Sequence, residues 1–277
     1  MKSIVHISDL HFGTENDFIK EALLDEIYKI MPKAVAISGD LTQRARTAQF
    51  IKAKEYIDRI KFPKVVIPGN HDISLFNPYK RFVNPLYKYK KYITDEMYPH
   101  YTDKDFSLIG INSARSLTWK SGRISLEQIE EIKSTILSIG SSLFKAVVIH
   151  HNLYPTPHNT KQNILGRTEI LLDEIDECGI DLILSGHRHF PYTAILNKNR
   201  ANKSSSVYIA AGTAFSTRTR NYPNSFNLLK LHYHYVENYT YCFCKKKFIP
   251  VTREIFTRDN HRFWVASHSE TLKRIEY

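Results

Sequence analysis

Seven short apolar runs, each rich in valine, isoleucine or leucine, recur along the first three-quarters of this chain and limit what it can fold into. They occupy residues 4–7, 34–37, 65–67, 108–111, 146–149, 182–184 and 207–210. Runs of three or four residues are too short for a buried helix, and their composition is typical of strands that are buried on both faces. We therefore expect seven buried strands.

Helical patterns lie between these runs. Apolar residues at three- and four-residue spacing fill residues 18–30 and stop before Pro32. Ser125 and Gln128 form a candidate capping box ahead of a second such pattern, and a third pattern ends at Gly179, a candidate C-cap. Strands that alternate with helices predict an α/β fold built from βαβ units.

The C-terminal region follows a different pattern. Apolar and polar residues alternate over residues 229–235 and again over residues 239–244. This alternation predicts an antiparallel hairpin with one buried face and a turn near Glu237. Because no repeat and no low-complexity linker interrupts the chain, we expect one domain over residues 1–277, with residues 226–277 as a C-terminal β extension.

The composition favours anionic partners. The formal net charge is +11 at pH 7, which suits phosphate-containing substrates, nucleic acid or an anionic membrane surface. Three cysteines do not make a disulfide framework. We expect no signal peptide, because the chain enters its first strand at once, and no run approaches the ~18 apolar residues of a membrane span. A cytoplasmic enzyme is the expectation, with a peripheral position at the inner membrane surface as the alternative.

The connections over residues 73–104 and 152–167 are unusually long, and loops of that length in a compact domain are usually functional or disordered. The first interleaves aromatic side chains with lysine and arginine and starts directly after Asp72. We therefore predict a cap-like insertion that covers the mouth of the site and selects substrates, with Tyr89 and Lys90 among its specificity residues. The alternatives are a membrane contact and a flap that only packs on the domain.

Aspartate, asparagine and histidine, residue types that are able to bind metal ions, follow five of the predicted strands directly. In chain order they are Asp9 and His11, then Asp40, then Asn70, His71 and Asp72, then His150 and His151, and finally His187 and His189. The carboxyl ends of strands in an open α/β sheet share one edge, which is where ligands bind. Residues far apart in the sequence are therefore expected to converge there.

Carboxylate, amide and imidazole groups together suit divalent ions such as manganese, iron and zinc. One ion rarely needs so many ligands, whereas two ions bridged by a shared carboxylate would use them all. Paired ions clamp a phosphoryl group and turn bound water into a hydroxide nucleophile at neutral pH. Each motif alone is weak, but the five in this order predict a metal-dependent phosphoesterase with two divalent metal ions.

As a set, these motifs resemble the signature of the calcineurin-like metallophosphoesterase superfamily. The motifs are Asp9-x-His11, Gly39-Asp40, Gly69-Asn70-His71-Asp72, His150 and Gly186-His187-x-His189. The resemblance covers residues 3–215. It implies a four-layer α/β/β/α sandwich of two mixed sheets flanked by helices.

The resemblance also implies a role for each matching residue. One metal ion would be held by Asp9, His11, Asp40 and His189, and the other by Asp40 as the bridge together with Asn70, His150 and His187. His71 matches the position that protonates the leaving group, and Asp72 is expected to orient its ring, since a carboxylate partner fixes the tautomer of an imidazole.

His151 has the same side-chain chemistry as His150, but strand alternation is expected to direct the two side chains to opposite sides. His150 is therefore taken as the metal ligand, and His151 is expected to line the site or pack behind it. Arginines near these loops are candidates for binding the substrate phosphate, with a solvated surface role as the alternative. They are Arg44, Arg115, Arg167, Arg188 and Arg218.

Three segments resemble the bacterial cyclic-nucleotide phosphodiesterase-like branch of the superfamily. They are Gly39-Asp40-Leu41-Thr42, Asn112-Ser113 and Gly212-Thr213-Ala214. The same neighbourhood includes hydrolases that split the pyrophosphate of UDP-diacylglucosamine. Asn152 stands where that branch commonly has proline, which alters a loop at the rim of the site.

The leading interpretation is hydrolysis of a phosphodiester or pyrophosphate bond in a small molecule. A nuclease acting on DNA or RNA is an alternative that the basic charge supports. A hydrolase of UDP-diacylglucosamine at the membrane surface is another. A non-enzymatic scaffold would be expected to lack ligands that this chain keeps, and the sequence indicates neither the metal nor the oligomeric state.

Overall fold

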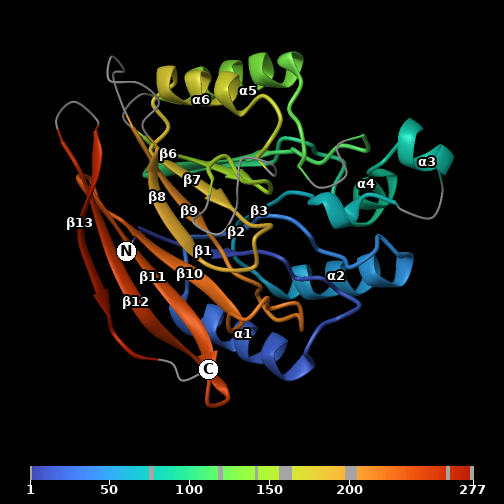
Figure 1. The fold of residues 1–277 in the computed structure, drawn as a ribbon, viewed down its shortest axis with the longest axis horizontal. Coiled ribbons are helices and arrows are strands. Elements are labelled where there is room, and N and C mark those ends of the chain that lie inside the picture. The colour runs from blue at the N-terminus through green and yellow to red at the C-terminus, as the bar shows by residue number, and fades with distance from the viewer. Residues whose placement is uncertain are drawn as a thin grey trace.

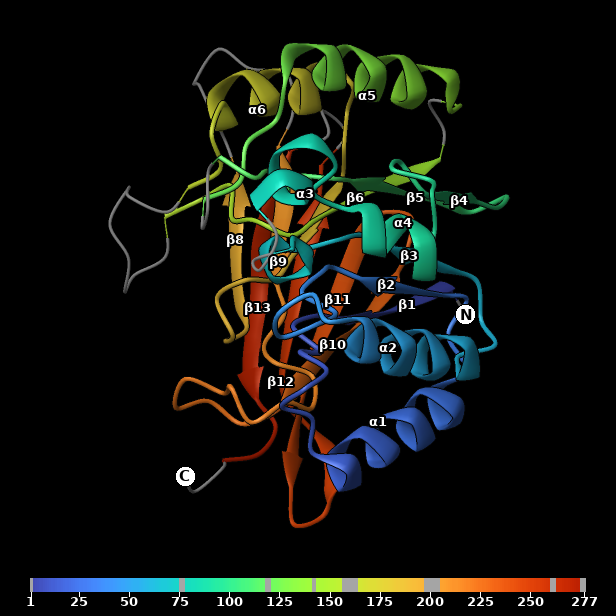
Figure 2. The same ribbon diagram turned by 90° about the vertical axis from the view of Figure 1, so that its right-hand side faces the viewer.

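The computed structural model describes residues 2–74, 78–117, 121–140, 143–155, 164–196, 205–259 and 263–274. In this part of the chain, two mixed sheets pack face to face and helices cover their outer faces (Figure 1, Figure 2). The four-layer α/β/β/α sandwich is therefore confirmed. No helix among the described residues combines the length and the apolar character that crossing a bilayer requires.

The first sheet contains both the N-terminal strand and the C-terminal strands. Its strands are β1 (Lys2–Ile7), β2 (Ala34–Ile37), β3 (Lys64–Val66), β10 (Ser225–Leu231), β11 (Tyr235–Cys244), β12 (Lys247–Arg258) and β13 (Trp264–Thr271). They lie in the order β13-β12-β11-β10-β1-β2-β3. Strands β1, β2 and β3 are parallel, and helices α1 (Asp17–Ile30) and α2 (Thr47–Arg59) connect them in βαβ fashion, as the sequence predicts.

The second sheet is built from the middle of the chain. Its strands are β4 (His100–Thr102), β5 (Phe106–Ile111), β6 (Phe144–Ile149), β7 (Leu182–Ser185), β8 (Tyr192–Leu196) and β9 (Ser206–Ala210), in the order β4-β5-β6-β7-β9-β8. Strands β5, β6, β7 and β9 are parallel to one another. Helices α5 (Leu126–Ser138) and α6 (Thr168–Glu177) cover its outer face (Figure 1).

Alternation along each strand explains why the short runs are apolar at every position. In β1, Val5 and Ile7 belong to the core beneath α1 and α2, whereas Ile4 belongs to the core between the two sheets. Because both faces are covered, both sets of side chains are buried. His6 shares the inter-sheet side with Ile4, where its Nε2 lies 2.9 Å from the Ser38 hydroxyl.

The helix boundaries follow the predicted end signals. The Ser125 hydroxyl accepts from the Gln128 N–H, and the Gln128 side-chain oxygen accepts from the Ser125 N–H, so the capping box of α5 is present. Gly179 takes a left-handed backbone at φ +65° just after α6, where glycine meets little steric resistance. These signals are local, which is why the sequence alone locates them.

The C-terminal strands form a longer antiparallel array than the predicted hairpin, and the predicted turn near Glu237 is wrong. The chain reverses at residues 232–234, where the His232 N–H donates to the Tyr235 carbonyl. Glu237 lies inside β11 because Arg253 and the Tyr239 hydroxyl, both 2.8 Å away, pair with its carboxylate. A charged residue inside a strand therefore does not mark a turn when the neighbouring strand supplies its partner.

The 73–104 insertion contains α3 (Pro78–Val83), α4 (Tyr87–Tyr92) and β4. Helix α4 packs on α2, where the Tyr92 ring stacks on Phe50 at a centroid distance of 6.3 Å. Tyr89 is fully buried, and its hydroxyl donates to the Val66 carbonyl at 2.8 Å. Tyr89, predicted as a specificity residue, therefore anchors the insertion to β3 through its side chain, which fits the alternative of a segment that packs on the domain.

We expect Tyr89→Ala to lower the free energy of unfolding by about 3 kcal/mol or more, because it empties a site in a packed core. Tyr89→Phe removes only the hydroxyl and should cost about 1 kcal/mol. Lys90→Ala, at an exposed neighbouring position, should change stability by less than ~0.5 kcal/mol. Urea unfolding of the three variants measures these differences, and equal stability of Tyr89→Ala and the natural chain would contradict the anchoring role.

Candidate metal centre

The predicted ligands lie on loops that leave the carboxyl ends of five strands at one edge of the sandwich. Asp9 and His11 follow β1, Asp40 follows β2, and Asn70 belongs to a 3-10 turn (Asn70–Asp72) after β3. Backbone hydrogen bonds join the loops: the Asp9 N–H donates to the Gly39 carbonyl and the His11 N–H to the Asp40 carbonyl. The second sheet closes the edge, where the Gly186 N–H donates to the His150 carbonyl.

Five of the predicted ligands have a left-handed backbone. The φ angles are 54° at Asp9, 47° at His11, 51° at Asp40, 73° at His187 and 65° at His189. Aspartate and histidine adopt this conformation more readily than most residues, but it remains uncommon for a residue with a side chain. Such conformations cluster at functional sites, where the surrounding structure holds them.

Asp40 and Asp9 lie at the middle of the cluster. The Asp40 carboxylate is 3.4 Å from His150 Nε2 and 3.7 Å from His11 Nε2. Asp9 Oδ1 lies 3.5 Å from both His11 Nε2 and His189 Nε2. These side chains are almost completely shielded from solvent. The donor atoms thus face one another at distances longer than an ordinary hydrogen bond.

Several buried atoms of the cluster have no hydrogen-bond partner among the described residues. They are Asp9 Oδ1, His11 Nε2, Asn70 Oδ1 and His150 Nε2. Buried polar atoms are normally paired, and each one left unpaired costs about 1–3 kcal/mol. The side chains also form groups whose ligand atoms lie within 4.8 Å of one another, among them Asp9–His11–His189 and Asp9–Asp40–His150. This donor set fits a centre for divalent metal ions, which would satisfy the unpaired atoms.

Neighbouring oxygens orient two of the imidazoles. His150 Nδ1 is 2.7 Å from the Ser38 carbonyl, which can only accept a hydrogen bond. His189 Nδ1 is 2.8 Å from the Thr213 hydroxyl, which donates its own proton to the Arg218 carbonyl and so accepts from the ring. Both rings therefore carry a proton on Nδ1. This arrangement directs the Nε2 atoms toward the carboxylates and is common behind metal-binding histidines.

The electrostatics of the cluster favour the metal-binding forms of its carboxylates. Burial alone would raise the pKa of Asp40, but the imidazoles of His150 and His71 outweigh it and hold this pKa well below its ordinary value. Burial alone would also raise the pKa of Asp9, but His189 and His11 outweigh it and hold this pKa below its ordinary value. Both aspartates are therefore ionised at neutral pH.

Burial lowers the pKa of His187 to about 3 and that of His189 to about 4, so both rings are neutral. His150 differs, because the charge of Asp40 overcomes the effect of burial and raises its pKa to about 9. A metal ion would replace that proton, since only the neutral imidazole binds a cation.

His71 lies beside the cluster, and its ring edge meets His11 at a centroid distance of 4.9 Å. The expected role of Asp72 as its orienting partner is not what the structure shows. The Gln43 carbonyl, 2.8 Å from His71 Nδ1, holds the ring instead. Asp72 accepts hydrogen bonds from the backbone of Gly69, Leu41 and Thr42 and from the Thr42 hydroxyl. The Asp72 carboxylate therefore ties the loop after β2 to the loop after β3.

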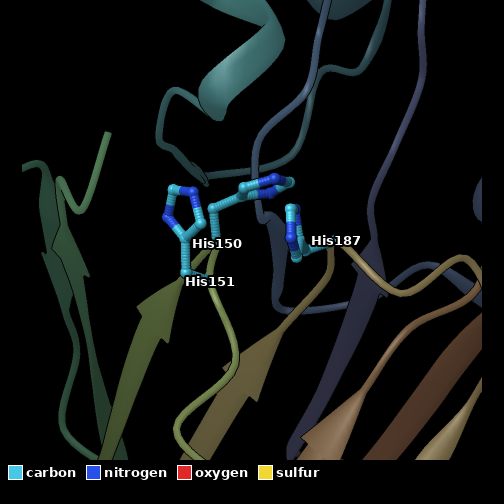
Figure 3. Close-up of side chains that lie close together, drawn as sticks. All are labelled: His150, His151 and His187. Atoms are coloured by element: carbon cyan, nitrogen blue, oxygen red, sulfur yellow. The ribbon is translucent and has the colours of Figure 1, made fainter. Parts of the chain in front are cut away.

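His150, His151 and His187 lie together in the centre, as Figure 3 shows. The ring centroid of His151 is 5.0 Å from that of His150 and 5.0 Å from that of His187. The expectation that His150 and His151 point in opposite directions is wrong, because β6 ends at Ile149 and strand alternation no longer applies. The two rings therefore lie next to each other, with ligand atoms of both close to His187.

Two neighbours, Ser113 and Gly122, fix the position of the His151 ring. Its Nδ1 is 2.7 Å from the Ser113 hydroxyl, while its buried Nε2 has no partner in the part of the chain that the structure describes. Gly122, with φ +64°, lies against the ring so closely that a Cβ at this position would overlap it. His151 thus presents a further nitrogen beside the His150 and His187 ligand atoms.

The candidate arginines occupy different places. Arg218 reaches the centre, where its Nη1 lies 3.1 Å from His71 Nε2 and 3.2 Å from the Gln43 side chain. Arg188 is buried beside Asn152. In the amide orientation that satisfies the hydrogen bonds of Asn152, its side-chain oxygen accepts from Arg188 Nε at 2.6 Å. Arg44 is exposed. Arg115 and Arg167 line a separate pocket with Arg123.

Sequence reasoning missed three groups that position the centre. They are the carbonyls of Ser38 and Gln43, and the side-chain hydroxyl of Thr213 as the partner of His189. Ser38 and Gln43 act through backbone oxygens, which every residue has, so side-chain chemistry gives no signal. Thr213 belongs to a segment that resembles the phosphodiesterase-like branch, and this was the available indication.

The fold and the donor set define a metal-dependent phosphoesterase. The chain belongs to the calcineurin-like phosphoesterase family, whose family model matches residues 2–191. It is 22% identical over 196 residues to a protein named probable cyclic nucleotide phosphodiesterase from Ruthia magnifica subsp. Calyptogena magnifica, covering 68% of this chain and 78% of the relative. A glycerophosphodiester phosphodiesterase from Enterobacter lignolyticus is 29% identical over 80 residues, or 25% of this chain and 29% of the relative.

Solved structures share the fold at low sequence identity. A dimetal phosphatase from Danio rerio superposes with a TM-score of 0.63 at 12% identity, over 90% of this chain and 98% of the other. A purple acid phosphatase from yellow lupin gives a TM-score of 0.68 at 11% identity, over 94% of this chain and 54% of the other. These likenesses concern the fold alone.

Proposed function

We propose that this chain hydrolyses a phosphodiester or pyrophosphate bond in a small molecule, using two divalent metal ions. One observation carries the proposal: donor side chains from five strand ends meet at one edge, and several of their buried nitrogen and oxygen atoms have no hydrogen-bond partner among the described residues. A purely structural cluster would be expected to satisfy its buried polar atoms.

The proposed ligand sets follow the geometry around the two aspartates. One ion would be held by Asp9, His11, Asp40 and His189, and the other by Asp40, Asn70, His150 and His187. The proximity of Asp40 to both His11 and His150 supports its role as the shared ligand. Manganese, iron and zinc all suit this mixture of oxygen and nitrogen donors.

When bound, such ions polarise the phosphoryl oxygens and lower the pKa of water. The residues of the chain supply the proton for the leaving group and further positive charge. His71 carries a proton on Nδ1, held by the Gln43 carbonyl, so Nε2 is the atom that takes up and delivers a second proton. Arg218, in contact with that nitrogen, is placed to bind a phosphoryl oxygen.

The names of the relatives favour a diester over a monoester substrate, because they include cyclic nucleotide and glycerophosphodiester phosphodiesterases. A pyrophosphate substrate such as UDP-diacylglucosamine and a nucleic-acid substrate stay as alternatives that the same centre could serve. A cytoplasmic location, with or without contact to the membrane surface, stays a prediction.

Hydrolysis by the purified chain with added Mn²⁺ tests the proposal. The substrates are bis-p-nitrophenyl phosphate, p-nitrophenyl phosphate, a cyclic nucleotide, UDP-diacylglucosamine and single-stranded DNA. We expect the diester to be cleaved faster than the monoester, with activity lost on chelation and restored by Mn²⁺. Cleavage of the monoester alone would overturn the diester assignment, and rapid cleavage of DNA would favour the nuclease.

A further inference from the structure

A second pocket lies beside the metal centre, between the 73–104 insertion and the connection from β5 to α5. Its volume is about 720 Å³. The insertion contributes residues 82–86, Lys90, Met97 and Tyr98 to the lining. The connection and the start of α5 contribute Asn112, residues 114–117, residues 123–125 and Gln128, and Arg167 completes it. We call it the insertion pocket.

The charge of the insertion pocket is entirely positive over its described lining. Lys90, Arg115, Arg123 and Arg167 line it, and no aspartate or glutamate is among the described lining residues. No ion pair joins any of these four cations to a carboxylate within the described part of the chain. Glu127, exposed on the first turn of α5, interacts electrostatically with Arg115 and Arg167 but does not line the pocket. A concave site with such a lining attracts anions.

Two of the arginines are held in place by backbone oxygens. Arg115 Nε donates to the Arg123 carbonyl at 3.3 Å, and Arg167 Nη1 donates to the Ile124 carbonyl at 3.2 Å. A guanidinium has five N–H donors, so each of these arginines keeps several for a ligand. Because their side chains are already oriented, binding an anion costs less conformational entropy than at freely moving arginines.

Hydrogen bonds link both walls of the insertion pocket to segments of the metal centre. The Ser74 N–H, two residues after Asp72, donates to the Pro85 carbonyl of the pocket wall. On the other side, Ser113 contacts His151 through its hydroxyl, and its carbonyl accepts from the Arg123 N–H at 3.0 Å. Residues of the pocket walls are therefore hydrogen-bonded to segments that carry residues of the metal centre, so the two sites are neighbours in the fold.

We infer that the insertion pocket binds a second phosphate group of the substrate, separate from the phosphate that is hydrolysed. The inference rests on the proposed function and narrows its substrate class to small molecules that carry two separated phosphates. The apolar part of the lining, which includes Leu86, Met97 and Ile124, would pack against the body that joins the two phosphates.

A matched pair of chromogenic diesters tests this inference on the metal-loaded enzyme. Thymidine 3′-(p-nitrophenyl phosphate) carries one phosphate, and its 5′-phosphorylated form differs only by the second. We expect the 5′-phosphate to raise kcat/KM about 10- to 100-fold, as a charge-assisted contact would. In Arg115→Gln/Arg167→Gln this ratio should fall to about one.

Lys90→Gln should lower the ratio in part, and its exposed position makes misfolding a poor explanation for the change. Lys245→Gln removes the same charge from the turn between β11 and β12 and should keep the full ratio. Equal kcat/KM for the two diesters in the natural chain, while bis-p-nitrophenyl phosphate is still cleaved, would overturn the inference and leave the proposed function standing. Failure to cleave any diester would instead reject the proposed function.

Discussion

Replacing Asp40 by alanine is expected to remove both metal ions and to lower the rate of diester hydrolysis by about 10³-fold or more. The carboxylate lies between His11 and His150, and it also accepts the His71 N–H at 2.8 Å. Its loss would leave each proposed ligand set without its shared member. Metal catalysis contributes several kcal/mol of transition-state stabilisation, and each 1.36 kcal/mol is a factor of ten in rate.

Asp181→Ala is the matched control for the Asp40 variant. Asp181 is also a buried aspartate, but it pairs with Arg258 at 2.6 Å, next to β7 at its amino end. This variant should lose stability and keep its metal. Metal content per chain is measured by inductively coupled plasma mass spectrometry, and two ions retained by Asp40→Ala would refute the bridging assignment.

His71→Ala is expected to keep the metal ions and to lose roughly 10²–10⁴ in rate, the usual share of general acid catalysis. The ring is held through Nδ1 by a carbonyl and meets Arg218 at Nε2, so its removal leaves the proposed ligands in place. The loss should be smaller for a p-nitrophenol leaving group, which needs little protonation, than for an alkoxide.

The control for His71 is His232→Ala, which removes an imidazole from the turn between β10 and β11 and should leave both rates unchanged. Rates for a p-nitrophenyl and an alkyl diester are compared in the same preparation, together with metal content. An equal loss for the two leaving groups would rule out proton donation, and loss of metal would show that His71 is a ligand or supports one.

The parts of this fold that depend on local patterns could be predicted from the sequence. Strands covered on both faces must be apolar at every position, so the short runs located β1, β2, β6 and β7. The end of such a strand is where the backbone reaches the open edge of the sheet. The polar residue types at these ends were therefore enough to indicate where Asp9, Asp40, His150 and His187 meet.

The remaining features depend on tertiary contacts that no local pattern encodes. Tyr89 is in an aromatic and basic segment that suggests a surface, yet the Val66 carbonyl and the α2 side of the core bury it. His151 turns toward the centre because its strand has ended and because its Nδ1 lies within hydrogen-bond distance of the hydroxyl of Ser113, which belongs to a distant connection. The backbone carbonyl of Gln43, and not the Asp72 carboxylate, orients the His71 ring. Every residue has such a carbonyl, so the sequence gives no sign of this contact.

The left-handed backbone at five proposed ligands lowers the stability of the metal-free protein at the residues that activity needs. A side chain in that conformation costs about 1–2 kcal/mol, and a buried donor atom without a partner costs about 1–3 kcal/mol more when no metal is bound. Glycine at His11, whose two ring nitrogens are both unpaired among the described residues, would relieve both costs at once. A selection for heat resistance alone, carried out without metal, would therefore enrich such a glycine and erase the enzyme while improving the protein.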